Sequence, residues 1–463
     1  MSLKIRSANL LTGEEDPETT LLDGGGTTQI MEIAAWNTTV SGLTFANGLL
    51  SYETYDSAAG GAAIKISSGT QTVKDCIFRG NKTVNAPGTC IRSTDYLTDI
   101  QIIGCTFTNN VQMVGDTSKK TMGSAIYIIG NSGTSSSAPA KIIDCIFDGN
   151  RAEGSLPEGS IVYAAYANVD NCSFLTNSFA YTGSSSSSAN GALFRFGDNT
   201  TVLNSRFSSP TVSGGNLVGT LMAAYGNNVI SNCTFSAIDD SANASSTIAT
   251  GVIGVRGKNI TFFDCVFRGN SAGRNGLMFI TSKENNNSLL RNCLFADNTQ
   301  YGQYSNLIRL QNCTGAIGVR IENCTFAGNV DAASGVRDSI GFSGSNFTCT
   351  NTYVNSVFTT PVSKALATAV ASNCCFSAWS GGPVDANNHT IAEFGGNLKF
   401  VDSANGDYHL TRRSPLRDKG MMLDWMVADA KDLDGNRRVF GELSDIGCYE
   451  CQILSPGFSI FVR

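Results

Sequence analysis

Residues 323–329 read NCTFAGN, and near copies of this heptad recur along the chain. The copies are DCIFRGN (75–81), DCIFDGN (144–150), NCSFLTN (171–177), DCVFRGN (264–270) and NCLFADN (292–298). In each of them a Cys stands two positions before a Phe, and an Asn stands three positions after it. A pattern this regular indicates an internal repeat, and a repeat decides the architecture before other signals are weighed.

The recurring Phe sets the length of the repeat. Its period is about 30 residues, with longer and shorter units where loops vary. The aligned positions are Phe45, Phe78, Phe107, Phe147, Phe174, Phe207, Phe235, Phe267, Phe295, Phe326, Phe358 and Phe376. The Cys column follows it through Cys76, Cys105, Cys145, Cys172, Cys233, Cys265, Cys293, Cys324 and Cys374, with Ser205 and Ser356 in two units.

A second recurring element lies upstream of the heptads. It is short and aliphatic or β-branched, its side chains alternate, and Gly or Asn stands at its ends. Examples are GGAAIKI (60–66), GSAIYII (123–129), GALFRFG (191–197), GVIGVRG (251–257) and NLIRLQN (306–312). Such stretches predict strands, and no helical periodicity interrupts them over residues 30–380.

A unit of two or three short strands cannot bury its own apolar face, but it can when stacked on copies of itself. The chain is therefore predicted to be an all-β solenoid, a single-stranded parallel β-helix of about 11–12 rungs over residues 1–380. A rung is one full turn of the solenoid. Residues 381–463 lack the repeat and are predicted to form a capping segment on the last rung, because an open solenoid end exposes unpaired strand edges.

The heptad itself follows from strand geometry. In NCTF the alternation of side chains places Cys324 and Phe326 inside, and Asn323 and Thr325 outside. Rungs stacked about 4.8 Å apart place each Phe over the next Phe and each Cys over the next Cys. The trailing Asn is expected to adopt left-handed backbone geometry and to bond to the Asn of the next rung. Its positions are Asn81, Asn110, Asn150, Asn177, Asn270, Asn298 and Asn329.

The chain has 15 cysteines. One Cys per rung at one strand position favours a column of buried free thiols over disulfides, because stacked thiols do not readily reach the disulfide torsion. The neighbours Cys374 and Cys375 are predicted to point to opposite faces. Cys448 and Cys451 form an isolated C-x-x-C, for which a local disulfide or two thiols are favoured over half a zinc site.

Composition excludes some classes of partner. Charged residues make up 15% of the chain and the net charge is -6, with no basic patch, so nucleic acid is not an expected partner. No apolar run reaches the roughly 18 residues of a membrane-spanning helix. The start, MSLKIRSANLL, lacks a secretory signal core and reads like the middle of a pattern, so we expect a fragment of a longer protein.

The repeats resemble known families. The heptads and glycine-flanked strands are similar to right-handed parallel β-helix proteins of the pectate-lyase-like class. GGAAI (60–64) with the repeated F-x-x-N motif resembles the repeats of polymorphic outer-membrane proteins. The stretches 400–420, 432–441 and 445–450 resemble the terminal segment of exported bacterial proteins called choice-of-anchor Q, with Arg437 in place of a Pro and Cys448 in place of an Ala. These resemblances imply that the β-helix is right-handed and that the protein is secreted or displayed at the cell surface.

Carboxylates for a polysaccharide lyase or a glycoside hydrolase are sparse along the repeat. The position before Cys holds Asp75, Asp144 and Asp264, but Gly or Asn on the rungs between them. Paired catalytic carboxylates lie roughly 5 to 10 Å apart, about one or two rungs, so this column offers no such pair. The isolated Asp residues are interpreted as turn residues, and a site built from other strands or loops stays open.

Three arginines are predicted to occupy comparable outward strand positions, where an acidic glycan could contact them: Arg195, Arg256 and Arg309. The alternative is that they only keep the sheet soluble. Three tyrosines could stack on sugar rings, although Tyr is also an ordinary strand residue: Tyr163, Tyr166 and Tyr225.

DLDGN (432–436) places Asp432, Asp434 and Asn436 at alternate positions, like the opening of a calcium loop. Leu443 stands where an EF-hand needs Glu, so an EF-hand is excluded and a turn of Asp-Gly type is favoured over a Ca²⁺ site. Ca²⁺ is thus the one cofactor that the sequence suggests. In DYHL the alternation predicts that Tyr408 and Leu410 point inward and His409 is a solvated surface residue.

Together these observations favour a secreted or cell-surface scaffold, a monomer that binds glycan or a host or matrix surface without chemistry. The alternative is a polysaccharide lyase or glycoside hydrolase acting on an acidic polysaccharide. A stalk that has lost its binding part is a third reading, because a β-helix by itself does not determine function.

Overall fold

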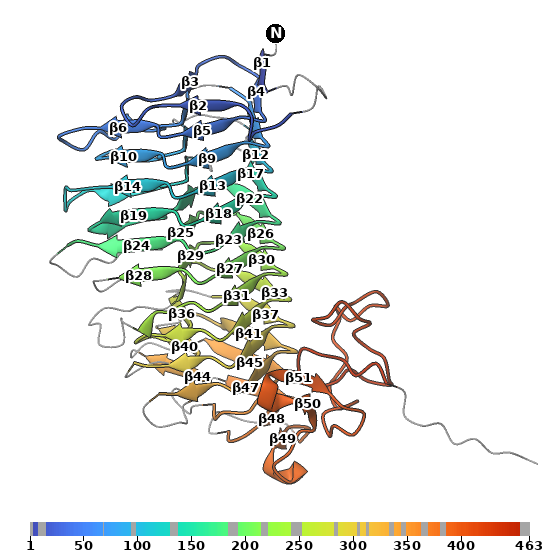
Figure 1. Cartoon of the computed structure of the whole chain (residues 1–463). Helices are drawn as coiled ribbons and strands as arrows, with labels where there is room; N and C mark the ends of the chain where they lie inside the picture. Colours follow the sequence, from blue (N-terminus) through green and yellow to red (C-terminus); the bar gives the residue numbers. More distant parts are fainter. Residues whose placement is uncertain are drawn as a thin grey trace, which may run out of the picture.

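The computed structural model describes residues 3–7, 15–67, 69–93, 99–129, 138–183, 193–213, 221–241, 252–281, 286–302, 306–311, 314–332, 338–343, 349–362, 369–379 and 386–453. The predicted boundary at residues 380 and 381 lies outside them. The described chain forms a long stack of short strands, with the C-terminal part beside one end of the stack (Figure 1).

Three long parallel sheets run the length of the stack in the described chain. Sheet A has 13 strands: β1 (Leu3–Arg6), β4 (Thr38–Ser41), β8 (Gln71–Lys74), β12 (Ile100–Ile103), β17 (Ala140–Ile143), β22 (Ala167–Asp170), β26 (Thr201–Leu203), β30 (Val229–Ser231), β33 (Thr261–Phe263), β37 (Leu289–Arg291), β41 (Ile317–Glu322), β45 (Thr350–Val354) and β47 (Ala369–Ser372). Sheet B has 14: β2 (Leu21–Asp23), β5 (Thr44–Ala46), β9 (Ile77–Arg79), β13 (Thr106–Thr108), β18 (Ile146–Asp148), β23 (Ser173–Phe174), β27 (Arg206–Ser208), β31 (Thr234–Ser236), β34 (Val266–Arg268), β38 (Leu294–Ala296), β42 (Thr325–Ala327), β46 (Val357–Phe358), β48 (Cys375–Phe376) and β49 (His389–Thr390). Sheet C has 11: β3 (Met31–Ile33), β7 (Ile64–Ile66), β11 (Ile91–Ser93), β16 (Ile126–Ile128), β21 (Val162–Ala164), β25 (Phe194–Phe196), β29 (Met222–Ala224), β32 (Ile253–Val255), β36 (Met278–Thr281), β40 (Ile308–Gln311) and β44 (Ile340–Ser343).

Shorter sheets complete the described structure. Sheet D has six strands: β6 (Leu49–Ser51), β10 (Lys82–Val84), β14 (Val111–Met113), β19 (Arg151–Gly154), β24 (Ser178–Tyr181) and β28 (Thr211–Ser213). The remaining elements are β35 (Ser271–Ala272), β39 (Thr299–Gln300), β43 (Val330–Asp331), β15 (Lys120–Thr121), β20 (Leu156–Pro157), β50 (Phe400–Asp402), β51 (Asp407–Leu410) and the 3₁₀ turns η2 (Ala392–Phe394) and η3 (Ser403–Asn405).

Each rung passes through sheets C, A and B, and in many rungs through D, before a loop leads to the next strand of sheet C. Strand pairing is parallel throughout the solenoid, and in the described chain only β50 and β51 form an antiparallel pair of strands. The predicted fold class is confirmed: the chain is an all-β parallel solenoid, consistent with a right-handed parallel β-helix.

The interior is organised around the repeated Phe. All twelve aligned Phe rings stack on their neighbours, with centroids 4.5 to 5.3 Å apart and planes within 15° of parallel. The cysteines of the heptads are buried free thiols. Cys105, for example, places its thiol 3.4 Å from the carbonyl of Ile103 and 3.5 Å from that of Val73 on the neighbouring rung. Cys349, which is outside the heptads, is disulfide-bonded.

The trailing asparagines are buried and bond from rung to rung, as predicted. Asn81 Nδ2 donates to Asn110 Oδ1 at 3.0 Å, and Asn298 Nδ2 donates to Asn329 Oδ1 at 2.9 Å. The prediction that they adopt left-handed geometry is wrong. The positive φ lies one residue earlier, as at Gly80 (62°) and Asn109 (53°), because that residue turns the chain out of sheet B and leaves the Asn side chain facing inward.

A second left-handed corner precedes Cys, where sheet A passes into sheet B. Asp75, Asp144 and Asp264 have φ of 51 to 55°, and Asn171, Asn292 and Asn323 share this conformation. The interpretation of the isolated Asp residues as turn residues is therefore confirmed. We call the residue before the Cys of a heptad, or before the Ser that replaces it in two units, the corner residue of its rung. Asn204, Asn232 and Asn355 are further corner residues, with φ of 49 to 52°.

The C-terminal segment (residues 386–453) does more than cover the last rung. Strand β49 extends sheet B at its end, but the rest folds back along the outside of sheets A and B (Figure 1). Corner residues hold it there: Asn292 Nδ2 donates to the carbonyl of Lys431 (2.9 Å), and Asn355 Nδ2 donates to that of Met421 (2.8 Å). Cys374 belongs to the solenoid core and Cys375 packs against the segment, so the two point to opposite faces as predicted.

Candidate carbohydrate-binding face

The outer face of sheet C carries a row of arginines and tyrosines. Arg92, Tyr127, Tyr163 and Arg195 are the middle residues of β11, β16, β21 and β25, and they are paired in register. On either side of Arg195, Phe194 and Phe196 point into the core, so the alternation of the strand sends Arg195 outward. The three-residue strands thus produce one outward side chain per rung.

The Arg195 guanidinium lies between two tyrosines. Its carbon is 4.9 Å from the centroid of the Tyr163 ring and 4.9 Å from that of Tyr225. Nη1 of Arg195 also donates to the Tyr163 hydroxyl at 3.2 Å. Tyr225 reaches this position from the turn after β29, because Ala223, the in-register partner of Arg195, is too small to fill the space. A cation between two aromatic faces is a favourable, oriented arrangement.

Glu158 fixes the charge of this cluster. Its carboxylate pairs with Arg195 through one oxygen and with Lys120 through the other. The Glu158 side chain is only 6% exposed, whereas Lys120 is 56% exposed and Arg195 22% exposed. The short parallel pair β15–β20 brings Lys120 beside Glu158, and the Glu158 N–H donates to the Thr121 carbonyl at 3.0 Å. We call Lys120, Glu158, Tyr163, Arg195 and Tyr225 the Arg195 cluster.

Titration behaviour in the cluster follows burial. Burial raises the pKa of Tyr163 to about 12 and also raises the pKa of Tyr225. Burial, helped by the charge of Arg195, lowers the pKa of Lys120. A general base works best with a pKa near the working pH, so neither tyrosine is set up for that role.

The other predicted glycan contacts lie in different surroundings. Arg256 is near Arg195 and Tyr225, and burial lowers its pKa. Arg309 is 9% exposed, with its guanidinium carbon 5.8 Å from the centroid of the Phe279 ring, four strands away from β25. Tyr166 is half-buried in the turn after β21, where its carbonyl accepts from the Ala140 N–H at 3.1 Å. The structure thus brings together Tyr163, Arg195, Tyr225 and Arg256 from the predicted set.

The predicted calcium ligands do not converge on one point. Asp432 Oδ1 accepts the N–H groups of Asp434 (3.1 Å) and Asn436 (2.8 Å), and its Oδ2 accepts that of Glu450 (2.9 Å). Gly435 has a φ of 79°, so the loop is built as the alternative Asp-Gly turn. In the part of the chain that the structure describes, no group of three or more His, Cys, Asp or Glu side chains is placed to hold a metal.

His409 lies on the outward side of its strand with its side chain 42% exposed, and Tyr408 and Leu410 point inward, as the alternation predicts; what the alternation does not predict is that His409 has partners. Its ring nitrogens lie 2.5 Å from Asp407 Oδ1 and 2.6 Å from Asp434 Oδ2, and its ring is 3.9 Å from that of Tyr449. Burial alone would lower the pKa of His409, but the two carboxylates outweigh it and the pKa is raised. His409 therefore ties strand β51 to the Asp432 loop.

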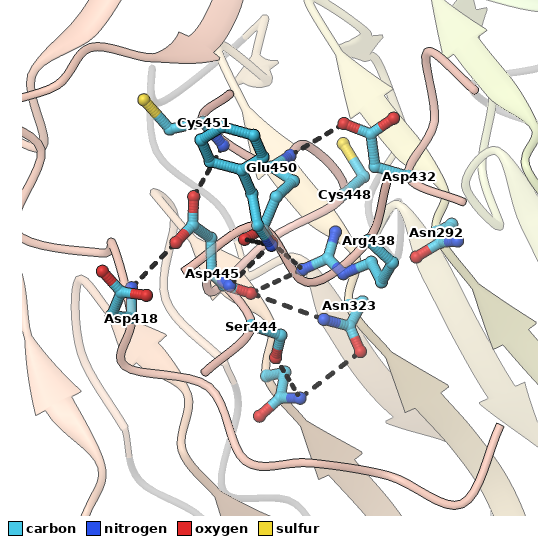
Figure 2. A network of polar contacts seen from close by, with 12 residues as sticks. Asn292, Asn323, Asp418, Asp432, Arg438, Ser444, Asp445, Cys448, Glu450 and Cys451 are labelled. Carbon is cyan, nitrogen blue, oxygen red and sulfur yellow. Dashed lines mark hydrogen bonds and ion pairs between the residues drawn. The ribbon is translucent and has the colours of Figure 1, made fainter. Parts of the chain in front are cut away.

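Figure 2 shows the buried polar network that holds the C-terminal segment. Arg438 is completely buried, donates to the Asp445 carbonyl at 2.6 Å and lies 3.7 Å from the Glu450 carboxylate. Asp445 Oδ2 accepts the N–H of Cys451 at 2.7 Å. Cys448 and Cys451 are free thiols, so of the readings left open for this C-x-x-C, the structure shows two thiols. Asp445 and Glu450 accept backbone N–H groups of the segment, and the corner residue Asn323 donates to the Asp445 carbonyl. Nε and Nη1 of the buried Arg438, by contrast, have no hydrogen-bond partner among the described residues. The contacts of the network are with the segment itself and with the solenoid corners, which is typical of a structural role.

Sequence reasoning missed Lys120 and Glu158 because they lie on and directly after the two-residue strands β15 and β20, between sheet D and sheet C, where the repeat is irregular. One signal was present. Gly88, Gly123 and Gly159 recur at the start of sheet C strands with φ of 64 to 71°, so Glu158 stands directly before a fixed position of the repeat. Aligning these glycines would have placed Glu158 near the row of outward residues.

Comparisons with known proteins give little. No protein-family model matches the chain, and no curated protein matches it. Among solved structures, an alginate lyase, AlyF-OU02 in complex with G6, is similar over 82% of this chain and 86% of its own, with 11% identity and a TM-score of 0.24. The two chains differ too much for the activity of the lyase to be carried over. In the described residues, no helix is long and apolar enough to cross a membrane.

Proposed function

We propose that this protein is an exported, monomeric β-solenoid scaffold that binds an acidic polysaccharide at the Arg195 cluster without changing it. The observation that supports this proposal is the placement of the Arg195 guanidinium between the rings of Tyr163 and Tyr225. The tyrosine rings hold Arg195 in a fixed orientation, and Lys120 presents an exposed ammonium to a sugar carboxylate or sulfate. The resemblance of the repeats to exported surface proteins supports a location outside the cell.

Charge supports an acidic ligand. Arg195, Lys120 and Arg256 carry three positive charges against the carboxylates of Glu158 and of Asp198, which lies near Tyr225, on a chain whose net charge is -6. This local excess of positive charge attracts an anionic polymer, while the rest of the surface repels it. Glu158 holds Arg195 in place, because a buried carboxylate with two cationic partners stays oriented.

A polysaccharide lyase is the second candidate, and one observation favours it. Burial and the neighbouring Arg195 lower the pKa of Lys120, which increases the fraction of the amine that is unprotonated and able to accept a proton. In this reading Lys120 takes the C5 proton of a uronic sugar whose carboxylate is held by the cations beside it; the C4–C5 double bond forms as the glycosidic C4–O bond breaks, and the leaving oxygen takes a proton from solvent.

The test is incubation of the full chain with acidic and neutral polysaccharides, with and without Ca²⁺. Retention on each polymer, absorbance of unsaturated product and reducing ends are measured together. We expect retention on acidic polymers only, without product, and a loss of about tenfold in affinity in Lys120→Gln and Arg195→Gln, the effect of one charge-assisted hydrogen bond. Lys82→Gln, which removes an exposed cation from sheet D, is the matched control and is expected to bind normally.

Two results would contradict the binding proposal. Equal retention of the wild type, Lys120→Gln and Arg195→Gln would show that the Arg195 cluster is not the site. Unsaturated product that disappears in Lys120→Gln would replace the scaffold with the lyase.

A further inference from the structure

The C-terminal segment carries a basic groove whose cations have no acidic partner among the residues that the structure describes. The groove has a volume of about 380 Å³ and is lined by Asn397, Lys399, Phe400, Thr411, Arg412 and Arg413. Three of its six lining residues are cationic, in a chain with more acidic than basic residues. These residues belong to elements other than those of the Arg195 cluster, so the two sites can succeed or fail independently.

Backbone contacts hold the basic groove in shape. The carbonyl of Lys399 accepts the N–H of Thr411 at 3.1 Å and its hydroxyl at 2.8 Å, which places Lys399 beside the start of the Arg412–Arg413 turn. The Ser414 hydroxyl donates to the Leu398 carbonyl at 2.7 Å, and Nη1 of Arg417 donates to the carbonyl of Arg412 at 2.9 Å. The three cations are therefore gathered by the fold of the β50–β51 hairpin, and Arg417 adds a fourth positive charge nearby.

The pairing of charges differs between the basic groove and the rest of the segment. Arg438 pairs with Glu450, His409 with Asp407 and Asp434, and Arg268 of the solenoid with Asp297. Among the described residues, no carboxylate lies within 4.0 Å of the charged nitrogens of Lys399, Arg412 or Arg413. Gathered like charges without a counter-charge repel one another, so an anion bound between them would be favoured.

Lys399 adds an independent observation. Its φ is 57°, which is a left-handed conformation. Nearly all the other non-glycine residues with a left-handed φ in the described chain are Asn or Asp. Gly or Asn would adopt this conformation at lower cost. The Lys399 N–H donates to Asn397 Oδ1 at 2.8 Å, which fixes this turn and places the exposed Lys399 side chain in the lining of the groove.

The basic groove opens beside a larger, mostly uncharged cavity. This cavity has a volume of about 740 Å³ and shares Asn397 and Phe400 with the groove. Thr359, Ser377 and Ser403 line it together with Tyr408, and the one carboxylate in its lining, Asp402, already accepts from Asn405. Hydroxyl groups beside aromatic rings match a neutral sugar ring, and the adjoining cations match an oxyanion attached to it.

We propose that the basic groove binds the oxyanion of an acidic sugar, a carboxylate or a sulfate ester, whose ring enters the adjoining cavity. The groove holds one such group, because its volume is small and its cations lie on one hairpin. Extended polyanions such as nucleic acid fit less well, because the net charge of the chain opposes them.

The experiment is a calorimetric titration of the full chain with glucuronate, glucose 6-sulfate, inorganic sulfate and glucose at low ionic strength. The variants are Arg412→Gln/Arg413→Gln and Lys399→Asn, in which Asn keeps the left-handed backbone and removes the charge. Lys419→Gln removes an exposed cation of the same segment outside the groove, and Arg195→Gln removes the centre of the other site.

We expect glucuronate and glucose 6-sulfate, the two anionic sugars, to bind the wild type more tightly than inorganic sulfate does. Glucose is expected not to bind. Affinity should fall at least about tenfold in the double Arg variant and in Lys399→Asn, with no loss of melting temperature in Lys399→Asn, and stay unchanged in Lys419→Gln and Arg195→Gln. Equal binding by the double Arg variant, binding of inorganic sulfate without the anionic sugars, or groove-dependent binding of DNA or anionic vesicles in their place would each overturn the proposal.

Discussion

The corner residues behave differently in the middle of the solenoid and under the C-terminal segment. Asn171 and Asn232 are exposed, and their amides donate only to the corner residues of the preceding rung, Asp144 (2.6 Å) and Asn204 (2.7 Å). Asn355 has the same left-handed φ, but it is buried and both donates to and accepts from the backbone of Met421 (2.8 and 2.7 Å). The repeat places Asn at the corner because Asn tolerates the left-handed backbone there. The C-terminal segment forms hydrogen bonds with the Asn side chain, which the corner itself does not need.

The outer face of sheet B shows the same contrast. Ile146, on a rung far from the segment, is 43% exposed, whereas Leu294 and Val357, at equivalent positions, are almost completely buried. The latter two pack against Tyr408 and Leu410 of the segment, among others. Identical repeats can therefore present either a solvated face or a docking face, according to what the rest of the chain places on them.

The largest expected effect is in the Phe stack that both regions share. Phe267 stacks on Phe235 and Phe295 at 4.8 and 4.5 Å, so Phe267→Ala leaves a cavity in a closed column. We expect a loss of roughly 3 to 5 kcal/mol in the free energy of unfolding, measured by urea denaturation. A loss below about 1 kcal/mol would show that the stack is not the core of the solenoid.

The next effect should be confined to the C-terminal segment. Arg438→Met removes the cation beside Glu450 and is expected to cost roughly 3 kcal/mol, the lower end for a broken buried ion pair, because Glu450 keeps two backbone donors. Trp425 reports on the segment, since its ring lies 4.5 Å from the guanidinium carbon of Arg291 on sheet A. Trp425 fluorescence should change at lower urea than the circular dichroism of the strands, and Trp425→Phe identifies the signal. Coincident transitions would mean that segment and solenoid unfold as one unit.

A matched pair of substitutions tests the two uses of the corner asparagines. Asn355→Gly and Asn232→Gly both keep the left-handed corner, so the backbone contribution cancels. Asn355→Gly should cost about 2 kcal/mol for its two hydrogen bonds to Met421, and Asn232→Gly under about 1 kcal/mol. Equal losses in urea denaturation would contradict the distinction between solvated corner residues and those that bind the C-terminal segment.

The smallest effect is a pH dependence of the segment. Burial raises the pKa of Glu450 from its ordinary value of 4.5 to about 7. The stabilisation from protonated Glu450 is therefore fully present below pH 4.5 and is lost as the pH rises through about 7. Burial raises the pKa of Asp445 too, which acts in the same direction. We expect the Trp425 transition to shift to lower urea between pH 5 and 8, and Glu450→Gln to flatten this shift; an unchanged shift would assign it to other groups.

The fold was predictable because one period repeats the same local solution. Cys-x-Phe specifies an inward pair, and the alternation around it determines the face of every neighbour, so the Phe stack followed from the sequence. The left-handed position was assigned one residue late because Asn carries two signals: it tolerates positive φ, and it bonds to its own kind. At the trailing position the Asn is explained by its bond to the Asn of the next rung. The residue before it, such as Gly80 or Asn109, makes the left-handed turn.

The candidate sites were predictable only where they lie on the repeated strands. Tyr163 and Arg195 followed from alternation, but Glu158 and Lys120 meet through the β15–β20 pairing, which no repeat specifies. His409 illustrates the same limit, because its own strand predicts its outward side but not its contact with Asp434, which is distant in sequence. Contacts between irregular segments depend on tertiary placement, and alternation carries no information about it.

The position of the C-terminal segment has a consequence for the order of folding. Leu294, Val357 and Cys375 are covered by residues that follow the solenoid in the chain, so the apolar strip on sheet B stays exposed until this segment docks. Exposed apolar strips favour association between chains, so docking of the segment also removes a surface through which copies of the solenoid would aggregate.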